Sequence, residues 1–299
     1  MLFLLLLLAH LIGDFPLQTD RMVELKATKP WFRSSLPLHT LIHLILAILF
    51  SVPYGIAHHQ WVVALAMSVI LAILHLMIDA CKVAVDAAIS KHGSLGLLLD
   101  VVVVKVSNSK IEKANPAGDP RVKPAAQELR VTKLMLFILD QLMHILAILA
   151  VLLIFEPHAV ASLEAFTMKI VHGQNPDLTI LARVLTIFIV GLYATVVSSV
   201  VVQILTYPAP ANTESTLEPD PQVPRGRLIG YLERLIVVTI VCIGAYTVIP
   251  LIVAAKSLAR FKKFDNQEWA EYFLVGTLSS ILCGTLSGLL LRVLLHIQS

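Results

Sequence analysis

Four apolar segments of the chain each carry two histidine or aspartate residues four positions apart. The pairs are His10 and Asp14, His39 and His43, His75 and Asp79, and Asp140 and His144. Residues four apart lie on one face of a helix, so both members of a pair can reach one point. Neutral imidazole and carboxylate groups are ligands for divalent transition metals. The pattern therefore predicts a site for one or two ions, with zinc as first choice and iron or manganese as alternatives.

The composition indicates that these pairs lie in a membrane. Charged residues make up only 14% of the 299 residues, against about 25% in soluble domains. Hydrophobic residues make up 57%, and the mean hydropathy is +0.83. The formal net charge of +3 is small, so no nucleic-acid partner is expected. The three cysteines have no paired spacing, which argues against a disulfide framework and a thiolate metal site.

The fold class predicted from the hydropathy pattern is an all-α membrane protein with about seven transmembrane helices. A hydrocarbon core about 30 Å thick requires about 20 apolar residues per helix. The segments that meet this requirement, the first two of them short, are residues 2–18, 36–52, 61–81, 134–155, 179–205, 228–252 and 270–295. No basic region precedes the first segment and no A-x-A site follows it, so we expect a retained span and not a cleaved signal peptide.

The first four spans should form an N-terminal four-helix bundle around the polar site, and the three later spans a module packed outside it. By residue ranges, the bundle covers 1–155 and a loop with the fifth span covers 156–206. A proline-rich polar linker covers 207–226, and a C-terminal two-span module covers 227–299. Within this module, Gly284 and Gly288 have the G-x-x-x-G spacing that favours close helix packing.

Basic residues predict how the spans are oriented. The segments after the first span and over 87–133 are rich in lysine and arginine, so both should be cytoplasmic and the N-terminus outside. All four pairs then lie at one depth, near the cytoplasmic leaflet. Two segments do not fit this scheme. "LGLLLDVVVVKV" (95–106) is too short to span and is a candidate re-entrant or interfacial segment, and "KSLARFKK" (256–263) is basic although alternation places it outside.

Two explanations without a metal compete with the metal site. Interhelical hydrogen bonds in membranes contribute less than about 1 kcal/mol on average, whereas inserting one ionisable group costs about 2.5–3.5 kcal/mol. A purely structural network is therefore the weaker explanation. A proton relay or ion pathway also concentrates histidine and aspartate inside a membrane, and it stays open. Haem is disfavoured because bis-histidine ligation leaves the three aspartates unexplained.

The segments that carry the pairs also resemble a known family. They are "AHLIGDFPLQTDRMVELK", "LHTLIHL", "HLMIDACK" and "LDQLMHIL". These are similar to the signature of the DUF3307 family of bacterial polytopic membrane proteins, which runs H-x-x-x-D-x-x-x-Q, H-x-x-x-H, H-x-x-x-D-x-x-K and D-Q-x-x-H. The resemblance continues in "GRLIGYLERLIV", "AAKSLARF" and "EYFLVGTLSS". It implies a multi-pass protein of the bacterial inner membrane whose matched residues form a site, but it supplies no reaction.

The first function that these residues suggest is a membrane-embedded metal-dependent hydrolase acting on a lipid-like or isoprenoid substrate. Bound ions would activate a water and stabilise the leaving oxygen. Lys82 is a candidate to stabilise a developing anion, and Gln18 and Asp86 are candidates to orient the water or support the ligands. A di-iron oxidoreductase would use similar ligands, but the HxxHH clusters typical of histidine-rich membrane oxygenases are absent.

The basic segment after the first span is a candidate headgroup site, because cations at a membrane interface attract anionic lipids. Its candidate residues are Arg21, Lys26 and Arg33.

The second function, from a different class, is a proton- or metal-coupled transporter that uses the same histidines and aspartates for permeation. Transporters of this kind often show internal repeats with broken helices at matching positions. No such repeat is evident, and the His/Asp pairs stop at His144. The hydrolase is therefore the favoured prediction.

Overall fold

The computed structural model describes residues 1–28, 34–92, 122–172, 174, 178–206 and 222–297, and no β-strand occurs among them. The predicted re-entrant segment 95–106 lies outside these residues. The helices are α1 (Leu2–Asp14), α2 (Asp20–Thr28), α3 (Leu36–Ala57), α4 (Trp61–His92), α6 (Val122–Phe155), α7 (Pro157–Val171), α8 (Ile180–Leu192), α9 (Ser198–Thr206), α10 (Gln222–Cys242), α11 (Ile249–Ala259) and α12 (Gln267–Leu295). The all-helical prediction is confirmed for the described residues, and α10 begins inside the predicted linker.

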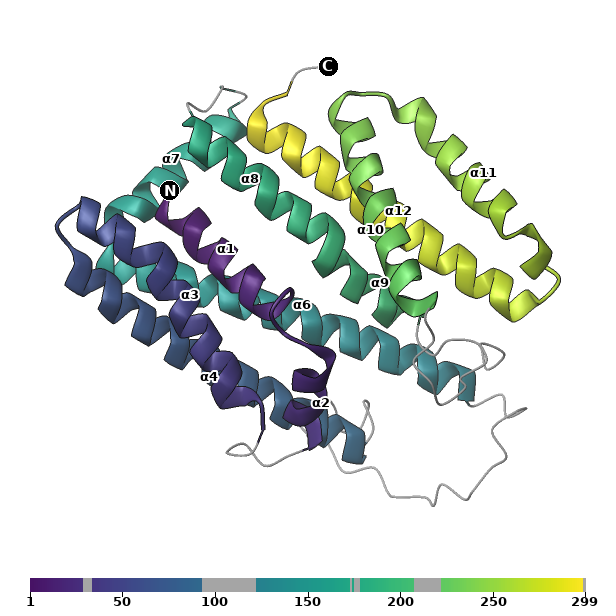
Figure 1. The fold of residues 1–299 in the computed structure, drawn as a ribbon, viewed down its shortest axis with the longest axis horizontal. Helices are drawn as coiled ribbons and strands as arrows, with labels where there is room; N and C mark the ends of the chain where they lie inside the picture. Colours follow the sequence, from purple (N-terminus) through teal and green to yellow (C-terminus); the bar gives the residue numbers. More distant parts are fainter. Residues whose placement is uncertain (29–33, 93–121, 173, 175–177, 207–221, 298–299) are drawn as a thin grey trace.

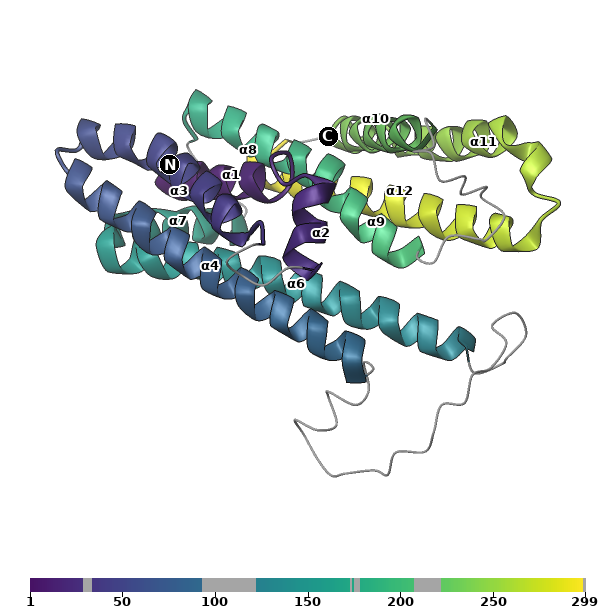
Figure 2. The ribbon, with the colours of Figure 1, turned by 60° about the horizontal axis from the view of Figure 1, so that its bottom comes forward.

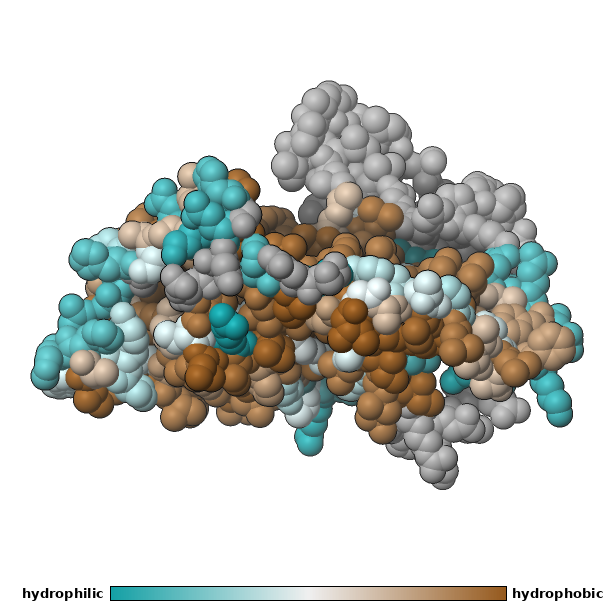
Figure 3. Space-filling model, turned by 90° about the horizontal axis from the view of Figure 1, so that it is seen from above, coloured by the Kyte–Doolittle hydropathy of each residue, from teal (hydrophilic) through white to brown (hydrophobic). Residues whose placement is uncertain are grey.

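Five helical segments in the described residues are long and apolar enough to cross a membrane. They are Leu36–Ala57, Trp61–Ile89, Arg130–Phe155, Ile180–Thr206 and Gln267–Leu295. Large apolar side chains stay exposed on them, for example Leu41, Ile45 and Leu49 on α3, as expected of surfaces that face acyl chains. In Figure 3, brown hydrophobic side chains occupy the middle of the visible face and teal hydrophilic residues gather toward its two ends.

The first predicted span, 2–18, is shorter in the structure. α1 ends at Asp14, in agreement with Pro16, since proline has no backbone N–H with which to continue the helix. α1 is nevertheless the central helix, because it packs against neighbours on two sides. Leu2 and Leu6 join a core cluster with residues of α4 and α6, and Leu11 joins one with residues of α8. Burial on both sides explains why nearly every residue of α1 is apolar.

The first four apolar helices lie together as a bundle. α3 and α4 form an antiparallel pair, and α6 runs beside α4 (Figures 1 and 2). Two fully buried serines, Ser51 on α3 and Ser68 on α4, are 2.8 Å apart between their hydroxyl oxygens. Small residues and hydroxyl pairs of this kind let membrane helices approach closely. The bundle therefore brings the polar faces of α1, α3, α4 and α6 to one interior.

The predicted span over 228–252 is not one helix. α10 ends at Cys242, Gly244 adopts a φ of 76°, and α11 runs back along α10 (Figure 1). Lys256 on α11 and Glu233 on α10 form an ion pair at 2.6 Å that joins the two helices. The reversal brings the end of α11 to the side where α6 begins and α9 ends. The basic segment 256–263 therefore lies at the same end as the basic segment after α1, which agrees with the positive-inside rule.

A buried arginine joins α10 to the fifth span. The π-helical turn Tyr193–Val197 connects α8 to α9. The Arg234 guanidinium, only 3% exposed, donates to the carbonyl oxygens of Ala194 at 2.6 Å and Thr195 at 3.0 Å. Carbonyl groups in irregular helical turns need such donors when water is excluded. Arg234 therefore fixes the position of α9 relative to α10.

The predicted G-x-x-x-G contact joins α12 to α10. A Cβ added at Gly288 would lie 2.7 Å from Val241 Cβ, and one added at Gly284 would lie 3.0 Å from Val237 Cγ1. Both distances are shorter than ordinary carbon–carbon contacts of about 3.5–4.0 Å. The absence of a side chain at these two positions therefore allows the close approach of the helices.

We predict that Gly288→Ala lowers the melting temperature of the detergent-solubilised protein. The added methyl must displace the β-branched Val241, and overpacking of this kind typically costs about 1–3 kcal/mol. Gly191→Ala is the matched control, because a Cβ at Gly191 meets nothing within 4 Å. Thermal melting followed by tryptophan fluorescence should separate the two variants. Equal melting temperatures would contradict the packing argument.

Candidate metal centre

The structure brings together all eight residues that the sequence predicts as metal ligands. α1 supplies His10 and Asp14, and its neighbours α3, α4 and α6 supply one pair each. The His/Asp cluster comprises His10, Asp14, His39, His43, His75, Asp79, Asp140 and His144, with relative exposures between 1% and 9%. The four pairs meet at one level of the bundle, although they lie in the last turns of α1, in the first turns of α3 and near the middle of α4 and α6. Their role as ligands remains a prediction.

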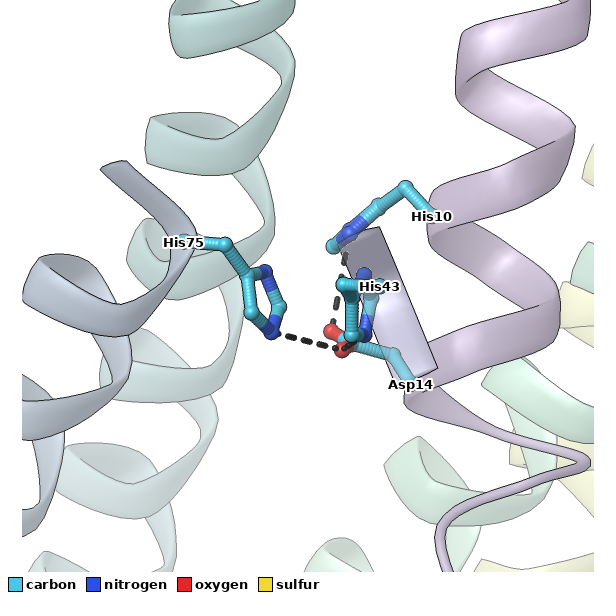
Figure 4. Close-up of side chains that lie close together, drawn as sticks. All are labelled: His10, Asp14, His43 and His75. Atoms are coloured by element: carbon cyan, nitrogen blue, oxygen red, sulfur yellow. Dashed lines mark ion pairs between the residues drawn. The ribbon is translucent and has the colours of Figure 1, made fainter. Parts of the chain in front are cut away.

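Asp14 lies at the centre of the His/Asp cluster. Its Oδ1 is 3.0 Å from His43 Nε2, 3.2 Å from His39 Nε2 and 3.6 Å from His75 Nε2. Its Oδ2 is 3.6 Å from His10 Nε2. Figure 4 shows the imidazoles of His10, His43 and His75 turned toward this carboxylate. One aspartate from α1 thus contacts histidines from three helices.

Two further groups overlap with this centre. Asp79 Oδ2 lies 3.5 Å from His39 Nε2 and 3.8 Å from His75 Nε2. Asp140 and His144 form the third group together with Asp14, and within each group the ligand atoms lie within 4.8 Å of one another. Because each further group adds residues that the first group lacks, the cluster has donors for more than one ion.

Several ring nitrogens in the cluster make no hydrogen bond of good geometry within the protein, although three of them lie within 3.6 Å of the Asp14 carboxylate. Among the described residues, this holds for Nε2 of His10, His43, His75 and His144, and for Oδ1 of Asp140. More than about 90% of buried polar atoms in proteins are hydrogen-bonded. Four unpartnered imidazole nitrogens that converge from four helices therefore indicate a site for a ligand that accepts lone pairs, which is either a proton or a metal ion.

The distances within the cluster fit a common ion. Ligands at about 2.0–2.1 Å from one tetrahedral ion lie roughly 3.3 Å apart. The separations of His10, His43 and His75 from Asp14, between 3.0 and 3.6 Å, bracket this value. A cavity of about 40 Å³ adjoins His10, His43, His75 and His144, which exceeds the roughly 10–15 Å³ that one water needs. The donor set therefore fits a small divalent ion in both chemistry and spacing.

Two lysines pair with the carboxylates of the cluster. Lys26 Nζ on α2 lies 2.5 Å from Asp79 Oδ2, and Lys82 Nζ on α4 lies 2.7 Å from Asp140 Oδ2. Three buried carboxylates face two ammonium groups, so the cluster carries a formal charge of −1 while its histidines are neutral. Burying such a charge is costly unless it is compensated. A divalent ion or a protonated histidine would supply the compensation.

The remaining predicted residues have different positions. Gln18, in the amide orientation that satisfies both of its ends, accepts from Lys26 Nζ at 2.5 Å and donates to the Asp14 carbonyl oxygen at 3.0 Å. Asp86 is exposed and lines a cavity with Lys82 and Lys133. Arg21 is exposed, as expected for a headgroup contact, but the neighbouring Lys26 is only 9% exposed and points into the cluster. Arg33 lies outside the described residues.

Two residues of the site were not predicted from the sequence. Gln141 donates to Asp14 Oδ2 at 3.3 Å, and its place in the D-Q-x-x-H pattern was the available signal. Gly13 lies against the His43 imidazole, because a Cβ at this position would be 2.5 Å from His43 Nε2. The missing side chain at Gly13 therefore leaves room for the His43 ring beside α1.

A larger cavity opens on the other side of Asp14. It has a volume of about 840 Å³ and borders Asp14, Gln18, Lys82 and Gln141 on the bundle side. Its opposite wall comes from α9, the turn before it, and α10. We call this cavity the polar chamber. It gives a molecule larger than water access to the central carboxylate.

We predict that Lys26→Met destabilises the protein strongly. Removing one partner of a buried ion pair costs about 3–5 kcal/mol, because the other charge remains buried. The double variant Lys26→Met/Asp79→Asn removes both charges and should recover much of the lost melting temperature. Additive losses in the double variant would show that the two side chains do not interact.

Comparison with known proteins agrees with the motif resemblance over the first part of the chain. The family described as Protein of unknown function (DUF3307) matches residues 2–172, which include α1–α7 and the whole His/Asp cluster. The match ends before α8, so the resemblance expected in the segments after the linker is not part of it. No curated protein and no solved structure matches the chain. Since the matched region exceeds half of the sequence, the chain belongs to the DUF3307 family.

Proposed function

We propose that this protein is a metal-dependent enzyme of the bacterial inner membrane, a hydrolase that acts on a lipid-like or isoprenoid substrate. The observation that carries this proposal is the convergence of four unpartnered histidine Nε2 atoms, from four helices, around Asp14. A structural network would satisfy its own polar atoms. In this cluster, four histidine Nε2 atoms instead point into the interior of the bundle without a hydrogen bond.

Zinc is the first choice of ion, with iron or manganese as alternatives. The cluster offers imidazole nitrogen and carboxylate oxygen, and none of the three cysteines is among the metal-site groups found in the described residues. Such nitrogen and oxygen donors suit all three metals. His10, His43, His75 and Asp14 form the best set for one ion, and a second ion would use either His39 and Asp79 together with His75, or Asp140 and His144 together with Asp14.

The surrounding residues have roles that follow from their contacts. A bound divalent ion would supply Lewis-acid chemistry and an activated water. Gln141 and His39 hold the Asp14 carboxylate in place through contacts of 3.3 and 3.2 Å. Gln18 connects Lys26 to the Asp14 backbone. Lys82, which is paired with Asp140 and borders the polar chamber, is placed to stabilise an anionic oxygen of the substrate.

A transporter is the second candidate, and one observation favours it. The cluster lies between the polar chamber on one side and the cavity of about 40 Å³ on the other. Histidines and aspartates between two cavities could pass a proton or an ion from one to the other.

A di-iron oxidoreductase would use the same ligands as the hydrolase and differ by an iron-specific redox signal.

We predict that the purified protein contains about one to two divalent transition-metal ions per chain. His43→Ala/His75→Ala should remove most of this metal, because both side chains lie within 3.6 Å of Asp14 Oδ1. Metal content is measured by inductively coupled plasma mass spectrometry after reconstitution with zinc, iron or manganese.

His58→Ala/His158→Ala is the matched control for this measurement, since both histidines are exposed and outside the cluster. It should leave metal content unchanged. A folded protein that binds none of the three metals would refute the metal enzyme and favour the proton pathway. Redox-active iron as the tightly bound metal would favour the oxidoreductase.

A further prediction tests the geometry without removing any ligand. Gly13→Ala should weaken metal binding, since its methyl would displace the His43 ring. Substituting a residue that contacts and orients a metal ligand typically lowers the affinity for the metal about 10–100-fold. Competition with a zinc-selective chelator measures the loss, and the melting temperature of the metal-free variant reports on folding. Unchanged affinity in Gly13→Ala would remove His43 from the ligand set.

A further inference from the structure

Lys82 lines three neighbouring cavities of the protein. It lines the polar chamber, a cavity with Asp86 and Lys133, and a groove of about 520 Å³ between α4 and α6. Its side chain is 34% exposed even though it is paired with Asp140. A single cation thus borders both the polar chamber and the outer face of the bundle.

The groove between α4 and α6 is apolar over most of its length. Its wall includes Leu74, Met77, Leu139, Met143 and Leu146, and four of these are exposed by 44% to 62%. Both helices are candidate membrane spans and run side by side in Figures 1 and 2. The groove therefore opens toward the hydrocarbon of a bilayer. Its only charged wall residues among the described ones are Lys82 and Asp140.

The length of the groove matches one leaflet. Its wall extends along α4 from Leu74 to Val85 and along α6 from Leu136 to Ala150, which is about 17 Å and about 21 Å at 1.5 Å per residue. Half of a hydrocarbon core about 30 Å thick is roughly 15 Å. The charged end, at Lys82, is toward the basic end of the bundle. An extended hydrocarbon chain with its polar end at Lys82 fits this arrangement.

The polar chamber offers the complementary environment for a headgroup. Beyond Asp20, Lys82 and the cluster residues, its wall includes Ser199, Gln203, Arg227 and Tyr231. These four residues belong to α9 and α10, outside the region matched by the family. Hydroxyl, amide and guanidinium groups are donors for phosphate oxygens. A divalent ion would change the formal charge of the cluster from −1 to +1, which favours an anionic ligand.

We propose that the α4–α6 groove and the polar chamber together form the binding site for an anionic lipid. The hydrocarbon chain lies in the groove, Lys82 marks the boundary, and the anionic headgroup, such as a phosphate monoester, enters the chamber beside Asp14. This inference rests on the proposed function and names the substrate class of that site. It also assigns α9 and α10 a part in headgroup recognition.

Photocrosslinking in nanodiscs tests this site. The discs contain phosphatidic acid with a diazirine in its acyl chain or, in parallel, the matching phosphatidylcholine. We expect the phosphatidic acid probe to label Met77, Leu139 and Met143 more than Leu274 and Leu282, which are exposed on α12. Excess unlabelled phosphatidic acid should abolish this enrichment, and inorganic phosphate should not.

Two matched variants on α6 sharpen the result. Met143→Trp fills the groove and should reduce groove labelling by about tenfold, because the indole displaces part of the hydrocarbon chain. Met135→Trp is the control, because Met135 is 64% exposed but does not line the groove. Lys82→Gln should remove the preference for phosphatidic acid over phosphatidylcholine.

The outcomes separate this inference from the proposed function, because metal content is measured on the same discs. Equal labelling of α4, α6 and α12 in metal-loaded protein overturns the lipid site and leaves the metal enzyme standing. Competition by inorganic phosphate as strong as that by phosphatidic acid overturns it in favour of a free-phosphate site. Groove labelling in protein that binds no metal supports the lipid site and refutes the metal enzyme.

Discussion

The buried carboxylate of Asp14 is the interaction on which the rest of the structure depends. A charge inside a low-dielectric interior must be met by partners at short range. Here α3 supplies two histidines, α4 a third and α6 the amide of Gln141, all within 3.6 Å of its oxygens. Each contact fixes the rotation and depth of one helix relative to α1. Apolar contacts alone specify the rotation and depth of a helix only weakly, because lipid tails and leucine side chains are equally apolar.

The sequence predicted the central cluster because its information is local. Spacings such as that of His39 and His43 define one face of a helix, and the positive-inside rule set the level at which the faces meet. The structure added what depends on contacts distant in sequence. Lys26 follows the first span in a polar segment, where its charge alone indicated a headgroup contact. Its pairing with Asp79, 53 residues away, depends on the position of α2 against α4.

The later half of the fold was harder to predict for a related reason. Hydropathy over 228–252 is continuous, and it does not reveal that the chain reverses near Gly244. The pairing of Lys256 with Glu233 and the hydrogen bonds of Arg234 to the π-helical turn are tertiary contacts that no periodicity shows. Spacing did predict the close contact at Gly284 and Gly288, because a small face on a helix is itself a local pattern.

The order of the ion pairs along the chain has a consequence for biogenesis. Lys26 precedes its partner Asp79, and Lys82 precedes Asp140 by 58 residues. When α1 to α4 have been synthesised, Lys26 can already neutralise Asp79, while Lys82 still lacks its carboxylate. The docking of α6 completes the fourth side of the cluster and covers the histidines of α1 and α4. The His/Asp cluster can therefore be enclosed only after residue 144 has been synthesised and inserted, which makes membrane insertion of α6 the step that completes it.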